Sequence, residues 1–277
     1  MSGLEILVAV GVPAVVAALW FSHRFGWWRG TVDEGLPRIL MYHMVREHVP
    51  GSRANKMRVR PADFEKQVRW LKENGWEFVT VSEIVDRREG RKRVAITFDD
   101  GYRDNLVHAL PILQKHDAKM TLYLVADRES CPDWPAQRRV SRAGSDLSRE
   151  ERLTDDDVRE LAASGLVELG SHTLTHVDLT QVDEATKERE LAESKTVIEE
   201  LSGQGVRTFC YPFGLFGDDD PARLRDSGYE AALTVEQGIS DPILDDPMRW
   251  KRVKVSGTEG MFSFRLRMRT GLRGWKK

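Results

Sequence analysis

Two adjacent carboxylates form the stretch of this sequence with the clearest capacity for chemistry. Asp99 and Asp100 follow a β-favouring run at residues 94–98 and precede Gly101, which is a turn signal. Neighbouring side chains on an extended chain point to opposite sides, so two acids at a strand end can do different jobs. Taken alone, the stretch fits a polar turn after a strand equally well.

A second polar cluster makes a metal site the better interpretation. His172 and His176 lie four residues apart, directly after a predicted strand at residues 166–170. If the segment is helical, both imidazoles lie on one face. Two neutral imidazoles and one carboxylate form a facial ligand set with open positions that suits a divalent cation. Such a cation acidifies bound water and polarises a carbonyl, while the second carboxylate can act as a base. The predicted reaction class is metal-assisted hydrolysis of an amide or ester.

Strands and helices alternate along the chain, which predicts an α/β fold with a mainly parallel sheet. The predicted strands are residues 38–42, 76–81, 94–98, 120–125, 166–170, 206–211, 231–235 and 251–255. The predicted helices begin at Pro61, after caps at Ser82 and Thr154, and at residues 104, 183 and 221. Residues 127–152 lack periodicity and are predicted to form a loop.

Sites in parallel α/β folds lie at the carboxyl ends of the strands. Several residues that can do chemistry directly follow predicted strands, namely His43, Asp99, Asp100, His172 and Pro212. We therefore expect these residues to converge on one face of the sheet.

The two polar clusters resemble the first two motifs of the polysaccharide deacetylases, the NodB-homology domains of carbohydrate esterase family four. Residues 97–101 (TFDDG) are similar to the first motif and residues 171–176 (SHTLTH) to the second, within a resemblance that covers residues 38–267. The resemblance implies a distorted, incomplete (β/α) barrel that removes an N-acyl group from an amino sugar. It also implies that Asp99 is the general base and that Asp100, His172 and His176 bind zinc or a similar divalent cation.

The third motif departs from the family pattern. Cys210 stands where the family has the arginine that steadies the base, two residues before Pro212. The main-chain N–H of Phe213 can still serve as the oxyanion donor, since that role needs no side chain. Arg249 is the favoured substitute for the missing arginine, whereas Arg252 is expected to be a solvated basic residue.

The late histidine that usually acts as the family's general acid is also missing, because no histidine follows His176. His43 ends the first predicted strand of the domain, and we take His43 or water as the substitute proton donor. Asp133 and Trp134 lie in the predicted loop and are expected to anchor that loop. These departures resemble the poly-N-acetylglucosamine deacetylases of biofilms and the lipid-linked sugar deacylases.

Length and charge limit the other possibilities. With 277 residues, of which 40% are hydrophobic, the chain can bury one sizeable core. The net charge of -2 gives no general case for nucleic-acid binding. Residues 260–277 carry +6 and the remainder carries -8. Apolar and basic residues alternate in this tail, which predicts a strand with one basic face or an irregular segment on anionic lipid.

The N-terminal segment predicts a single membrane anchor. Residues 4–21 carry one charge, at Glu5, and are long enough for a transmembrane helix. A cleaved signal peptide fits less well, because no basic residue precedes the apolar run. Basic residues after the span favour a cytoplasmic domain, whereas most members of the resembled family act outside the cytoplasm, so both sides are left open. The predicted divisions are an anchor at residues 1–30, a catalytic domain at 31–259 and a basic aromatic tail at 260–277.

These features together predict a membrane-anchored, metal-dependent sugar N-deacylase that acts on an envelope glycan or a lipid-linked amino sugar. One alternative is an allantoinase-like hydrolase of small cyclic amides, which the anchor disfavours. Another is a glycan-binding protein without turnover. The intact set of Asp99, Asp100, His172 and His176 disfavours that second alternative.

Overall fold

The computed structural model describes residues 3–87, 90–128 and 146–272 of the chain. Its strands are β1 (Arg38–Tyr42), β2 (Met44–Val45), β3 (Arg58–Val59), β4 (Glu77–Phe78), β5 (Arg93–Phe98), β6 (Met120–Leu124), β7 (Val167–Ser171), β8 (Thr208–Cys210), β9 (Ala231–Gln237) and β10 (Trp250–Lys254). Its helices are α1 (Gly3–Phe25), α2 (Pro61–Glu73), α3 (Val81–Asp86), α4 (Leu110–His116), α5 (Asp155–Ala163), α6 (Glu184–Ser202), α7 (Asp220–Asp226) and α8 (Met261–Thr270). Short 3-10 turns, among them η1 (Arg53–Lys56) and η5 (Pro212–Gly214), connect these elements.

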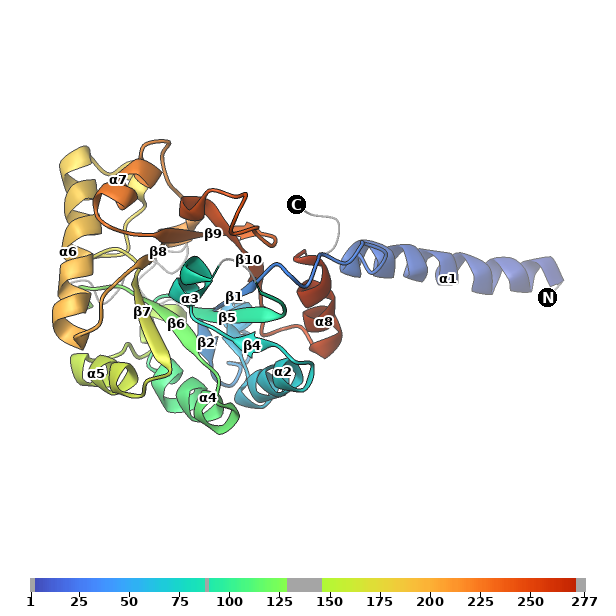
Figure 1. The fold of residues 1–277 in the computed structure, drawn as a ribbon. Helices are drawn as coiled ribbons and strands as arrows, with labels where there is room; N and C mark the ends of the chain where they lie inside the picture. The colour runs from blue at the N-terminus through green and yellow to red at the C-terminus, as the bar shows by residue number, and fades with distance from the viewer. Residues whose placement is uncertain (1–2, 88–89, 129–145, 273–277) are drawn as a thin grey trace.

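A closed parallel barrel forms the centre of the molecule. Eight strands lie in the order β1-β10-β9-β8-β7-β6-β5-β4, and β1 also pairs with β5, so the sheet closes and β4 stays outside the ring. Within the described residues the ring therefore has seven strands, one fewer than a complete (β/α) barrel. Figure 1 shows α2, α4, α5 and α6 around the outside of the ring. The predicted (β/α) barrel is confirmed.

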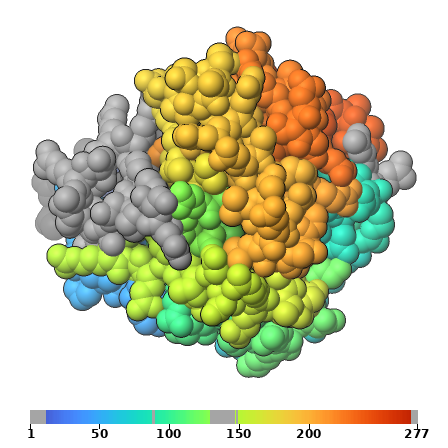
Figure 2. All heavy atoms as spheres, turned by 90° about the vertical axis from the view of Figure 1, so that its left-hand side faces the viewer, coloured from blue at the N-terminus to red at the C-terminus, as the bar shows by residue number. Residues whose placement is uncertain are grey.

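Alternation along the strands divides the core into two parts. Successive side chains of a strand point to opposite sides of the barrel wall. One set, which includes Leu40 and Ile96, packs against the surrounding helices. The other set fills the barrel interior and includes Tyr123, Leu233 and Trp250. Figure 2, viewed from the left of Figure 1, shows α5 and α6 among the elements that cover the outer side.

Helix α3 closes the amino-terminal end of the barrel interior. Its cap is Thr80, whose hydroxyl accepts the Glu83 N–H at 3.2 Å while the Glu83 carboxylate accepts the Thr80 N–H at 2.8 Å. The predicted cap, Ser82, instead lies inside the helix and donates its hydroxyl to Glu168 near the start of β7. The carboxyl end of the barrel is thus the end at which a site can open.

The C-terminal segment differs from its prediction. The alternation of apolar and basic residues predicts a strand or an irregular segment, but residues 261–270 form helix α8. Phe264 and Met268 belong to the main core, and the Phe264 ring lies 5.9 Å from the ring of Trp70 on α2. A helix buries positions four apart, so burial of this pair against the barrel outweighs the two-residue pattern. Most of the predicted tail is therefore packed against the domain.

Helix α1 extends away from the barrel, and its last turn contacts α8 (Figure 1). The rings of Phe21 and Phe25 lie 5.8 Å and 5.3 Å from the ring of Phe262, and Arg24 donates to Glu259 at 3.0 Å. In the part of the chain that the structure describes, no helix combines the length and the apolar character needed to cross a bilayer.

Part of the predicted loop at residues 127–152 cannot be compared with the structure. Asp133 and Trp134, the two residues expected to anchor it, lie outside the described residues. The described part from residue 146 onward leads into α5, which Thr154 caps as predicted.

Arg38 joins the two ends of the domain, which leads to a stability prediction. Its buried guanidinium donates to the carbonyl oxygens of Met268, Asp33, Leu36 and Val32 at 2.6–2.9 Å. We expect Arg38→Met to lower the free energy of unfolding by at least about 3 kcal/mol, because several buried acceptors lose their donor.

Urea unfolding measures this effect, with Arg159→Met as the matched control. Arg159 is exposed and, among the described residues, bonds to Asp156 of its own helix, so its loss is expected to cost less than about 0.5 kcal/mol. Equal destabilisation by the two substitutions would contradict the role assigned to Arg38.

Candidate active site

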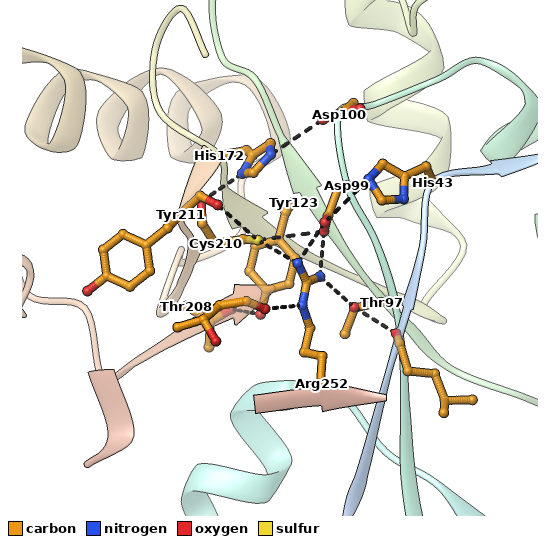
Figure 3. Close-up of polar contacts among 12 residues, drawn as sticks. His43, Thr97, Asp99, Asp100, Tyr123, His172, Thr208, Cys210, Tyr211 and Arg252 are labelled. Carbon is orange, nitrogen blue, oxygen red and sulfur yellow. Dashed lines mark hydrogen bonds and ion pairs between the residues drawn. The ribbon is translucent and has the colours of Figure 1, made fainter. Parts of the chain in front are cut away.

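The predicted site residues gather at the carboxyl end of the barrel. His43 follows β1, Asp99 and Asp100 follow β5, and His172 follows β7. These residues line a cavity of about 260 Å³ together with His176 and Phe213. Figure 3 shows His43, Asp99, Asp100 and His172 converging from the ends of β1, β5 and β7. The predicted convergence on one face of the sheet is confirmed for these four residues, whereas Phe213, and not its neighbour Pro212, lines the cavity.

Asp99 is held by a buried arginine from β10 (Figure 3). Arg252 donates through Nη1 to Oδ1 at 2.7 Å and through Nη2 to Oδ2 at 2.8 Å, a bidentate pair. Its Nε donates to the Thr234 carbonyl at 2.8 Å, and Nη1 also lies 3.2 Å from the Thr97 hydroxyl. Burial raises the pKa of the Asp99 carboxyl, but Arg252 outweighs burial and holds that pKa below its ordinary value. Asp99 is therefore ionised at neutral pH.

The arginine that fills this role is Arg252, not the favoured Arg249. Arg249 is largely exposed, lies 3.7 Å from Asp246 and places its guanidinium over the Phe216 ring at 5.2 Å. Arg252, expected to be solvated, is 1% exposed. The reason is register: residues two apart on β10 share a face, so Arg252 lies on the interior side with Trp250.

Cys210 contacts the same guanidinium. Its Sγ lies 3.2 Å from Arg252 Nη2 and 3.7 Å from Asp99 Oδ1. A cysteine occupies much less space than the arginine that the family pattern places here. The space beside Asp99 is therefore filled by a guanidinium that comes from β10.

Asp100 faces the two imidazoles. Its backbone is left-handed, with φ of 75°, which turns its carboxylate away from that of Asp99. Oδ1 lies 3.4 Å from Nε2 of His172 and 3.4 Å from Nε2 of His176. Burial raises the pKa of the Asp100 carboxyl, but the two imidazoles outweigh burial and hold it well below its usual range.

The segment between the two histidines is a loop. The sequence predicts that both imidazoles lie on one face only if this segment is helical, and it is not. Thr173 and His176 have left-handed backbones, with φ of 67° and 60°. Glu190 on α6 is fully buried and accepts the N–H groups of Leu174 and Thr175, both at 2.8 Å. This carboxylate fixes the loop so that both imidazoles reach Asp100 without helical geometry.

The hydrogen bond of His172 sets its tautomer. Nδ1 lies 2.6 Å from the carbonyl oxygen of Cys210, and a carbonyl oxygen can only accept, so Nδ1 carries the proton. Nε2 is then the ring nitrogen that faces Asp100 and is left to bind a cation. This carbonyl–imidazole arrangement is the usual support of a metal-ligating histidine.

The residues present fit a divalent cation. Ligand atoms of Asp100, His172 and His176 lie within 4.8 Å of one another, and Oδ2 of Asp100 is buried with no hydrogen-bond partner among the described residues. A buried carboxylate oxygen without a donor is costly, and a cation satisfies it.

A second cluster, Asp99, His172 and Cys210, is equally compact but suits a cation less. Both oxygens of Asp99 already accept from Arg252, and burial raises the pKa of the Cys210 thiol. Since a thiol must be deprotonated to bind a metal, the Asp100 cluster is the better site.

His43 lies beside the base. Its Nε2 is 4.0 Å from Asp99 Oδ2, and its carbonyl accepts from Asn105 at 3.0 Å. Burial lowers the pKa of His43 below its ordinary value in spite of the nearby Asp100 and Asp99 carboxylates. The ring is therefore neutral at neutral pH.

Pro212 and Phe213 form the turn after β8. Phe213 has a left-handed backbone with φ of 59°, and its ring lies 4.9 Å from that of His176. A Cβ on Gly214 would lie 2.4 Å from Val235 Cγ2, so only glycine fits at the next position. The turn thus brings Phe213 to the wall of the cavity, while its role as an oxyanion donor stays a prediction.

Comparison with known proteins identifies the family. The polysaccharide deacetylase family profile matches residues 86–232, slightly more than half of the chain. The chain belongs to the polysaccharide deacetylase family. This confirms the resemblance carried by the two motifs.

Three relatives show how far the likeness extends. The Bacillus subtilis protein YxkH is 28% identical over 73% of this chain and 65% of its own length. The poly-β-1,6-N-acetyl-D-glucosamine N-deacetylase of Escherichia coli K12 is 34% identical over 48% of this chain but only 20% of its own length. A solved polysaccharide deacetylase from Bacillus cereus has a TM-score of 0.70 and 27% identity, covering 84% of this chain and 69% of its own. The chain thus spans less than two thirds of the first two.

Two functional positions of this family member were missed or ranked wrongly from sequence. Arg252 was available from the two-residue spacing to Trp250, which predicts a common face on β10. Glu190 gives no such signal, because it lies among many acids of a charged helix and only the packing of α6 against the loop buries it.

The ligand set predicts the cation affinity of variants. We expect Asp100→Ala and His176→Ala each to weaken Zn²⁺ binding more than about 100-fold, since loss of an outer-shell partner alone costs 10- to 100-fold. Isothermal titration of the metal-free protein measures this. His108→Ala, at an exposed histidine, is the control and should bind as the unmodified protein does. Unchanged affinity in both ligand variants would refute the assignment.

Proposed function

We propose that the protein is a metal-dependent N-deacetylase of an amino-sugar glycan, of the poly-β-1,6-N-acetylglucosamine type. The observation that carries this proposal is the pairing of two differently placed carboxylates. Asp100 faces His172 and His176, while Asp99, outside that set, is ionised and held by Arg252. The name of the Escherichia coli relative supports the choice of glycan.

The proposed cation is zinc, held by Asp100, His172 and His176. Two imidazoles and one carboxylate with open positions are a common ligand set of hydrolytic zinc sites. Bound there, the cation supplies acidity to a water molecule and polarises the acyl carbonyl.

Asp99 is the base in this proposal. Its carboxylate takes the proton of the attacking water, and Arg252 keeps both its orientation and its ionised state. The N–H of Phe213, on the cavity wall, donates to the oxyanion that forms at the acyl carbon.

His43 relays the proton to the departing nitrogen. Its ring is neutral and lies 4.0 Å from Asp99, so it can receive the proton from Asp99 and pass it to the amine as the C–N bond breaks. The products are a free amine on the sugar and the carboxylic acid. This relay replaces the late histidine that the chain lacks.

Acetate release tests the proposal. The unmodified protein, loaded with Zn²⁺, is expected to release acetate from β-1,6-linked N-acetylglucosamine oligosaccharides. Asp99→Asn should lower the rate by about 100- to 10,000-fold, the usual contribution of a general base, while Zn²⁺ binding is retained. Failure of the unmodified protein to release acetate from any amino-sugar substrate would refute the enzymatic function and favour a glycan-binding protein without turnover.

The two arginines give a sharper prediction. Arg252→Lys keeps the positive charge but loses the bidentate geometry, so kcat/KM should fall about 100-fold. Arg249→Lys, the same change at the exposed arginine, should alter kcat/KM less than about 3-fold. Thermal melting of both variants controls for unfolding. A larger loss from Arg249→Lys would contradict the assignment.

A further inference from the structure

Two lysines line the same cavity as the carboxylates and imidazoles. Lys56 comes from η1 and Lys254 from the end of β10, so the two ammonium groups reach the cavity from different parts of the chain. Neither has a part in the hydrolysis proposed above. Ammonium groups beside a binding cavity attract anions, so the two lysines indicate that the ligand of this cavity carries a negative charge.

The backbone segments that carry Lys56 and Lys254 are in direct contact. The Gly257 N–H, three residues after Lys254, donates to the carbonyl of Lys56 at 3.0 Å. A Cβ on Gly257 would lie 1.7 Å from the carbonyl oxygen of Arg58, so a glycine is needed for this approach. The spacing of the two lysines is therefore set by backbone contacts.

The segment that carries Lys56 is itself rigid. Ser52 caps η1 by accepting the Ala54 N–H at 3.1 Å, and the Arg58 guanidinium donates to the Ser52 hydroxyl at 2.8 Å. Arg58 is fully buried and also donates to Glu150 at 2.7 Å. Lys56 thus extends from a fixed backbone, which favours a defined binding position.

The carboxylates of the cavity do not account for the charge of Lys56. Asp99 is neutralised by Arg252, and Asp100 faces the imidazoles and the cation that they would hold. Within the described ranges, Lys56 forms no ion pair with any carboxylate. Its charge is available to a ligand of the cavity.

We propose that Lys56 and Lys254 form a subsite for an oxyanion, a phosphate or carboxylate, on the reacting amino sugar or on its neighbour. The inference rests on the proposed N-deacetylase function and extends its substrate from neutral poly-N-acetylglucosamine to amino sugars that carry an acidic group. At about 260 Å³ the cavity is slightly below the usual range for enclosed ligand sites, about 300–1,000 Å³. It has room for about one sugar residue, so the oxyanion lies close to the N-acyl group.

A binding experiment tests the subsite without turnover. Isothermal titration of Zn²⁺-loaded Asp99→Asn protein compares N-acetylglucosamine 1-phosphate, N-acetylmuramic acid and the neutral methyl glycoside of N-acetylglucosamine. At least one acidic sugar is expected to bind 10-fold or more tightly than the glycoside. The tighter of the two acids shows whether phosphate or carboxylate is the source of the charge.

Adding Lys56→Gln and Lys254→Gln together should remove that preference and leave the neutral glycoside unaffected. Lys66→Gln, at an exposed lysine on α2, is the control. A preference that survives the double substitution belongs to the cation and overturns the lysine subsite, as does equal binding of all three sugars.

Acetate release by the protein with an intact Asp99 separates the two proposals. Acetate release without a lysine-dependent preference would support the N-deacetylase function and refute the lysine subsite. A lysine-dependent preference without acetate release from any of the sugars would support the lysine subsite and refute the N-deacetylase function.

Discussion

The buried ion pair of Asp99 and Arg252 is the interaction on which the rest of the site depends. An isolated carboxylate in a protein interior becomes protonated, and a protonated acid cannot act as a base. Both oxygens of Asp99 accept from Arg252, whose Nε donates to the Thr234 carbonyl. Because β5, β9 and β10 each supply one part, the ionised state of Asp99 depends on closure of the barrel. Such pairs become costly when one partner is lost.

Backbone strain is concentrated around the same cavity. Among the described non-glycine residues with left-handed backbones are Asp100, Thr173, His176 and Phe213, all within the two motifs and the turn after β8. Each such residue costs on the order of 1–3 kcal/mol and persists only where its surroundings hold it. Glu190 supplies that support for the histidine loop through two backbone N–H groups. The rigid barrel thus stabilises a set of side-chain directions that an unstrained chain would not adopt.

Sequence reasoning succeeded where the signal is local. The strand before Asp99, the cap at Thr154 and the convergence of the acidic pair with His172 and His176 follow from neighbouring residues and from the rule that sites lie at strand ends. The choice of Asp100 as the ligand came only from the family resemblance. Prediction from the sequence failed where a contact with residues far away in the chain determines the structure.

The spacing to Trp250 places Arg252 on the interior face of β10, but the local sequence does not show that Asp99 lies opposite it across the barrel. The tail became helix α8 because its apolar residues pack on α2 and the core. Membrane attachment and its side stay predictions from residues 4–21 and the charges that follow them.

The position of α3 has a consequence for how material reaches Asp99. Side chains fill the barrel interior and α3 covers its amino-terminal end, so in the described part of the chain the barrel has no through passage. A polymeric substrate therefore cannot pass through the barrel. It has to lie across the opening at the carboxyl end, with one sugar unit inserted into the cavity. In the proposed deacetylation, incoming water and the outgoing acid would share that mouth, so each cycle would include clearing it before the next unit enters.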